Sequence, residues 1–175
     1  MNKLNLKKHQ VFACTLVFVS SFASQAEITS QSDSSFTVTH SFVSNKSIST
    51  ARHEFGHVGR WWTSEFTLSG KGNNMYFNSK GMHERMPSGE TITHLIKTEK
   101  ADNQWTWAGT LGKLKNEKVN GEMKISIKER HHQTKITMKY TVTSDLLVSN
   151  QNWPSYIDNM LSVQMNSLKK SLNNR

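Results

Sequence analysis

The sequence predicts an α+β fold in which a strongly bent antiparallel sheet wraps around one long helix near the C-terminus. Between Phe36 and Val142, several stretches alternate apolar and polar residues, which is typical of strands buried on one face. From Trp153 to Leu172, apolar residues instead recur at helical spacing. A run of strands with a single helix that needs burial favours the α+β class.

The N-terminal segment has the pattern of a secretory signal peptide. Its first ten residues contain lysines and no acid, the apolar run Val11–Phe22 follows, and small residues lead to Ala26. That run is shorter than the roughly 20 residues that span a bilayer. We expect cleavage after Ala26, so that 1–26 is a signal peptide and 27–175 one periplasmic or secreted domain. An uncleaved anchor is the alternative.

Composition narrows the chemistry of the expected mature chain. The only cysteine, Cys14, lies in the leader, so neither a disulfide nor a thiol nucleophile is expected in the domain. The net charge of the full chain is +9, of which +6 remains after the expected cleavage, and lysines at alternate positions of the last two strands are typical of a solvated sheet face. Weak contact with an anionic membrane surface is a further possibility. We predict no nucleic-acid ligand, cofactor or stable partner protein. The lysines are Lys124, Lys128, Lys135 and Lys139.

The first elements are a strand and short helices. Residues 27–34 are polar, and we expect a flexible start there. The following strand has its inward positions at Phe36, Val38, His40 and Phe42. A short helix is expected at 47–55, and Gly56 and Gly59 divide the next region into a second short piece.

Six further strands and a closing helix complete the expected fold. The strands are placed at 73–79, from 81 to the turn at 87–90, at 91–99, at 104–110, and around 123–127 and 136–142. Trp153 and Pro154 open the helix. Its buried positions are Ile157, Leu161, Gln164, Met165, Leu168 and Leu172.

Taken in order, several segments resemble the SRPBCC or START-like superfamily, in its polyketide cyclase/dehydrase-like branch. The resemblance covers about 36–172, and Lys113 departs from it because related sequences usually have proline there. It implies a helix-grip fold, in which a seven-stranded sheet, with two short helices after its first strand, grips the C-terminal helix around an apolar cavity. Lipid carriers, cyclases and chaperone activators share this fold, so no single activity is implied. The segments are Val58–Trp62, Phe66–Gly70, Gly81–Pro87, Ile92–His94, Gly109–Leu114 and Ile157–Lys169.

One hairpin register places an acid beside a histidine in the predicted cavity. Burying the methionines and isoleucines sets Met86 opposite Ile92 and Met82 opposite Ile96, so that Glu84 faces His94. Such a pair is a structural ion pair or a polar anchor for a ligand. An acid/base pair for a cyclase, dehydratase or isomerase is the catalytic alternative.

We therefore expect an exported binding protein that encloses an apolar or amphipathic small molecule, with no reaction assigned. Glu84, His94 and His40 are the polar candidates, and together they would also form a two-histidine, one-carboxylate metal site. The apolar contacts expected are Met75, Phe77, Met82, Trp105, Trp107, Met123, Ile125, Met138 and Tyr140.

The segment His53-Glu54-Phe55-Gly56-His57 matches the zinc-peptidase motif, in which two histidines bind zinc and the glutamate acts as the base. A zinc peptidase is therefore the third functional alternative, with His53 and His57 as weak metal candidates. Two glycines where the helix should end, and the absence of a further histidine at position 63, favour a coincidental match on a short surface helix.

Overall fold

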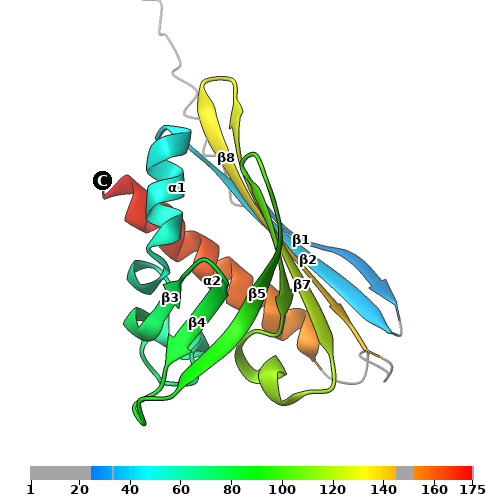
Figure 1. Ribbon diagram of the computed structural model, residues 1–175. Coiled ribbons are helices and arrows are strands. Elements are labelled where there is room, and N and C mark those ends of the chain that lie inside the picture. Colours follow the sequence, from blue (N-terminus) through cyan, green and yellow to red (C-terminus); the bar gives the residue numbers. More distant parts are fainter. Residues whose placement is uncertain (1–24, 33, 145–151, 175) are drawn as a thin grey trace, which may run out of the picture.

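The computed structural model describes residues 25–32, 34–144 and 152–174. It is α+β, as predicted, with one antiparallel sheet lying against a long helix (Figure 1). The helices are α1 (Ile48–Gly56) and α2 (Trp153–Asn173), with short 3₁₀ helices η1 (Val58–Arg60), η2 (Ser64–Phe66), η3 (Gly72–Asn74) and η4 (Gly112–Asn116). The strands are β1 (Gln25–Ser32), β2 (Ser35–Ser44), β3 (Met75–Phe77), β4 (Gly81–Arg85), β5 (Thr91–Ala101), β6 (Gln104–Gly109), β7 (Asn120–Arg130) and β8 (Gln133–Thr143).

The sheet has the order β1-β2-β8-β7-β6-β5-β4-β3, so β2 pairs with the distant β8. The seven predicted strands correspond to β2 to β8. The prediction of a flexible start at 27–34 is wrong, because β1 forms an eighth strand on the edge of β2. The expected strand at 73–79 is shortened to β3 because η3 precedes it. Residues 1–24, most of the expected signal peptide, lie outside the described residues.

Helix α1 begins and ends at side-chain hydrogen bonds. At its start, Ser47 Oγ accepts the N–H of Thr50 at 3.1 Å, as an N-cap does. At its end, Trp61 Nε1 donates to the carbonyl oxygens of Glu54 and Phe55, both at 3.2 Å. These carbonyls lie in the last turn, where intrahelical partners run out. The buried indole of Trp61 thus fixes where α1 stops.

Helix α2 buries the face that the sequence predicted, and it contacts β2 and the C-terminal half of α1 (Figure 1). Its one buried amide, Gln164, holds the loop between η1 and η2: Gln164 Oε1 accepts the N–H of Thr63, and Gln164 Nε2 donates to Thr63 Oγ1, each at 2.9 Å. Within the described part of the chain, no helix is both long and apolar enough to cross a membrane.

Candidate functional site

Glu84 and His94 meet in the interior, as the sequence predicted. Nε2–H of His94 donates to Oε2 of Glu84 at 2.8 Å, and the two residues are 2% and 0% exposed, respectively. The carboxylate also accepts the backbone N–H of Leu68 at 3.1 Å and that of Ser69 at 2.5 Å. Glu84 on β4 therefore connects β5 to the loop that follows η2.

These hydrogen bonds decide the ionisation of Glu84. Burial alone would raise its pKa, but donors from Ser69, Leu68 and His94 together hold the pKa below its usual value. The carboxylate is therefore ionised at neutral pH, and its oxygens are already occupied by protein donors. This arrangement favours a structural role over proton transfer.

The predicted register of this hairpin is wrong in detail. Glu84 lies opposite Ile92, two residues from its predicted partner, and a β-bulge between Met82 and His83 then sets Met82 opposite Leu95. As a result Ile96 points outward and is 59% exposed, although the sequence placed it in the interior. Glu84 still reaches His94 because neighbours diagonally across two strands remain within side-chain reach.

His40 is buried on β2 but does not join Glu84 and His94. Its Nε2 is 2.8 Å from Oδ1 of Asp158 on α2, a partner that sequence reasoning missed. No group of three histidine, cysteine or acidic residues within the described ranges could hold a metal ion. The two-histidine, one-carboxylate site is therefore contradicted.

The zinc-peptidase geometry is also absent at α1. The helix ends at Gly56, and His57 is its C-cap. The rings of His53 and His57 still lie side by side, with centroids 4.4 Å apart, so the departure from the motif concerns the glutamate. Glu54 is 1% exposed and accepts a hydrogen bond from Ser171 of α2 at 2.5 Å, whereas His53 and His57 are exposed. The glutamate that would act as base thus faces the interior while both histidines face solvent.

Three buried nitrogen atoms have no hydrogen-bond partner among the described residues: Nδ1 of His40, Nδ1 of His94 and Nε1 of Trp107. Buried polar atoms usually have such partners. All three residues are at most 6% exposed, so an added polar group would reach these atoms only by displacing their neighbours.

The predicted apolar contacts lie on the inner face of the sheet, where most are packed against one another. Phe77 and Trp105 are half-buried, and both stack on Phe55 of α1. Tyr140 is fully buried and donates to the carbonyl oxygen of Gly109 at 2.9 Å, and burial raises its pKa. Those at most 6% exposed are Met75, Met82, Trp107, Met123, Ile125, Met138 and Tyr140.

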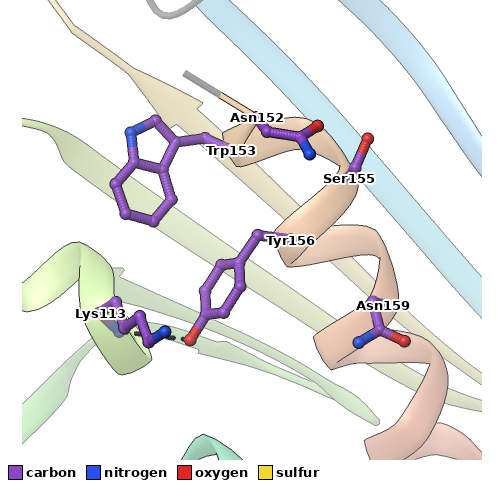
Figure 2. A pocket seen from close by; sticks show the side chains of 6 residues that line it. All are labelled: Lys113, Asn152, Trp153, Ser155, Tyr156 and Asn159. Atoms are coloured by element: carbon purple, nitrogen blue, oxygen red, sulfur yellow. Dashed lines mark hydrogen bonds between the residues drawn. The ribbon is translucent and has the colours of Figure 1, made fainter.

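An open pocket lies elsewhere, between η4 and the first turns of α2 (Figure 2). We call it the α2 pocket. Its volume is about 480 Å³. It is lined by Lys113, Asn152, Trp153, Ser155, Tyr156 and Asn159.

Aromatic rings and one ammonium group form the core of the α2 pocket. Trp153 and Tyr156 meet edge to face with ring centroids 5.6 Å apart. Phe66 packs against Tyr156, also edge to face, with ring centroids 5.9 Å apart. Lys113 Nζ lies 5.8 Å from the Tyr156 ring centroid, and the Lys113 N–H donates to the tyrosine hydroxyl at 3.4 Å. Gly112 makes room for this contact, because a Cβ there would lie 2.7 Å from the hydroxyl.

Sequence reasoning named two of these residues without recognising a site. Lys113 stood out because it replaces an expected proline, and Trp153 because it opens the helix. The missing signal was the approach of η4 to α2, two elements that are separated in sequence by β7 and β8.

No protein-family model matches the sequence, and no curated protein matches it either. Solved structures do resemble the fold. An uncharacterized protein from Rhizobium leguminosarum matches with TM-score 0.58 and 10% identity over 87% of this chain and 99% of its own. One from Bacillus thuringiensis matches with TM-score 0.56 and 16% identity over 78% and 98%. Ara h 8.0201 matches with TM-score 0.53 and 9% identity over 81% and 99%. At such identities the likeness concerns the fold alone, which is the α+β helix-grip arrangement.

Proposed function

We propose that this chain is an exported SRPBCC- or START-like protein that binds a small amphipathic molecule in the α2 pocket. The observation that carries the proposal is the composition of the pocket wall. Trp153 and Tyr156 provide apolar faces, and among the described residues Lys113 is the only charged one that lines it. Such a wall suits a ligand with an apolar or aromatic body and a negatively charged or hydrogen-bond-accepting end.

The size of the pocket supports a small-molecule ligand. Its volume of about 480 Å³ lies within the range of roughly 300–1,000 Å³ that is typical of such sites. The amides of Asn152 and Asn159 and the hydroxyl of Ser155 add groups that both donate and accept hydrogen bonds. These groups would orient the polar end of the ligand.

Binding deeper in the interior remains a prediction. Most of the predicted apolar contacts are packed against one another, so a ligand there would have to displace side chains from a dense core. The α2 pocket is open without such movement. We therefore place the ligand in the α2 pocket, with the inner face of the sheet as the support behind it.

The enzymatic alternative receives less support. Glu84 and His94 are buried, and the carboxylate already accepts hydrogen bonds from Leu68, Ser69 and His94. A substrate would have to displace the loop at Leu68 and Ser69 to reach it. Support for export comes from the basic and apolar pattern of residues 1–26.

A fluorescent anionic amphiphile, 8-anilinonaphthalene-1-sulfonate, tests the site directly. Trp153→Ala removes an aromatic wall, and we expect the affinity for this probe to fall about tenfold. Lys113→Gln removes the ammonium group, and we expect a loss of about fivefold, as for a partly exposed ion pair. Native mass spectrometry of protein purified from the periplasm of an expressing bacterium would then show whether a small molecule co-purifies.

Lys115→Gln is the matched control, because Lys115 lies in the same 3₁₀ helix but its Nζ donates to the carbonyl oxygen of Thr93, outside the pocket. We expect this variant to bind the probe as the wild type does. Equal affinities of the wild type and the Trp153 and Lys113 variants would refute the proposed site.

A further inference from the structure

The outer face of the β7–β8 hairpin sets lysines directly opposite one another. Lys124 pairs with Lys139, and Lys128 pairs with Lys135, across antiparallel strands. Side chains at such positions have Cβ atoms only about 5 Å apart, and like charges there are destabilising. The inner face of the same strands carries buried apolar residues, so all four ammonium groups lie on one outward surface. We call this surface the lysine face.

Most of the charge on the lysine face is not neutralised by the protein. Lys124 Nζ forms an ion pair with Glu122 at 2.9 Å, and both side chains are about half exposed. Within the described residues, no carboxylate lies within ion-pair distance of Lys128, Lys135 or Lys139. The pairing of β7 with β8 therefore holds ammonium groups close together at an electrostatic cost. A sheet face that contacted only water would not require this arrangement.

From this juxtaposition we propose that the lysine face docks onto the anionic headgroups of a lipid bilayer. Four residues along a strand span about 13 Å, so the two lysine pairs cover an area comparable to a few headgroups. Lysine acts as a point charge that attracts phosphate without requiring a fixed geometry. Juxtamembrane basic residues bind anionic bilayers in this way.

The residues between the lysine pairs favour a lipid surface over nucleic acid. Ser126 and Thr137 face each other between the two pairs and add hydroxyl groups. Nucleic-acid bases stack on aromatic side chains, and none of the outward-facing residues of β7 and β8, both of which are described in full, is aromatic. The hairpin also projects at one end of the molecule beyond the neighbouring β5–β6 turn (Figure 1), so a flat surface could approach it.

Vesicle co-sedimentation with the full chain tests this proposal. Pure phosphatidylglycerol vesicles are compared with pure phosphatidylcholine vesicles at low and high salt. We expect binding to phosphatidylglycerol that salt weakens, since each lysine near the surface contributes through screened attraction. The Lys128→Gln/Lys135→Gln double variant should bind about 30-fold more weakly. Any contribution of the apolar run Val11–Phe22 is the same in every variant.

The matched control is Lys71→Gln/Lys118→Gln, which removes the same net charge from exposed positions outside the lysine face. It should lose no more than a fewfold in affinity. The lysine-face variant should also keep or raise its melting temperature, because it relieves a like-charge pair, so that unfolding would not explain weaker binding.

Three results would overturn the proposal. The first is an equal loss of vesicle affinity in the two double variants. The second is the absence of a preference for phosphatidylglycerol at low salt. The third is a lysine-face variant that binds vesicles as the wild type does but has lost affinity for double-stranded DNA. The 8-anilinonaphthalene-1-sulfonate titration measures the α2 pocket separately, so failure of either proposal leaves the other standing.

Discussion

His94 and Glu84 form a hydrogen bond of 2.8 Å in a part of the interior that solvent does not reach. The same carboxylate accepts the backbone N–H groups of Leu68 and Ser69, so one side chain joins β4, β5 and the loop after η2. A buried carboxylate is tolerated when several donors compensate its lost hydration. The pair therefore fixes a loop whose backbone would otherwise lack these acceptors.

Replacing Glu84 with glutamine should destabilise the protein. Glutamine keeps one oxygen acceptor, but its NH₂ group replaces the other oxygen. The N–H donors that now bind that oxygen would then face another donor, and the charge-assisted hydrogen bonds would be lost. We expect the free energy of unfolding to fall by about 2–4 kcal/mol, measured by urea denaturation. Glu90→Gln, at an exposed turn position, should change it by less than about 0.5 kcal/mol.

The pH dependence of stability should identify the ionised form of Glu84. The pKa of Glu84 is lowered from 4.5 in the folded state. The contribution of its carboxylate to the free energy of unfolding is therefore complete above pH 4.5 and is lost as the pH falls through the folded-state pKa. The difference in unfolding free energy between the wild type and Glu84→Gln should therefore be constant near neutral pH and shrink below about pH 4.5.

The pKa of His83 is lowered as well, chiefly by burial and by nearby His94. A lowered histidine pKa makes stability fall as pH drops below 6.5, in the wild type and in the Glu84 variant alike. The difference between the two proteins isolates Glu84. A difference that grows toward acid pH would contradict a lowered pKa.

Strand and helix periodicity predicted most of this fold because each element buries one face. The stripe from Ile157 to Leu172 identified α2, and the alternation from Phe36 to Phe42 identified β2. β1 was missed because an edge strand is held by backbone hydrogen bonds to β2 and needs no apolar alternation. Periodicity cannot detect an element of that kind.

The candidate site was predicted only in part. The Glu84–His94 contact was found from the parity of two strands, but the bulge at Met82 was not, because an extra residue leaves no mark in a short pattern. Asp158 and the α2 pocket were missed because they depend on how α2 lies against β2 and η4. Contacts between elements far apart in the chain are set by packing, which local patterns do not encode.

Gly121→Ala should be strongly destabilising although it adds one methyl group. A Cβ at Gly121 would lie 2.1 Å from the carbonyl oxygen of Gly109 and 2.2 Å from the hydroxyl of Tyr140. These atoms form the hydrogen bond that joins β8 to the end of β6, so the strands would have to separate. We expect a loss of about 2–3 kcal/mol in unfolding free energy.

Gly56→Ala is the matched control for that experiment. Gly56 lies in the last turn of α1, and a Cβ there meets no atom within 4 Å. Alanine is the better helix former, so stability should stay the same or rise by up to about 1 kcal/mol. Equal effects of the two substitutions would show that the contact at Gly121 is not tight.

The β7–β8 turn should become more stable when its two histidines are replaced. Arg130 pairs with Gln133, and the two residues between them, His131 and His132, have φ angles of 51° and 63°. A two-residue hairpin loop with both φ angles positive favours Asn-Gly, because side chains with a Cβ are strained in the left-handed region. The double variant His131→Asn/His132→Gly should therefore raise the unfolding free energy by about 1 kcal/mol. His57→Gly, where φ is −95°, should lower it instead. Glycine there relieves no strain, adds freedom to the unfolded chain and removes the hydrogen bond between His57 Nδ1 and the carbonyl oxygen of His53. A turn variant less stable than the wild type would mean that the histidines make compensating contacts at the tip.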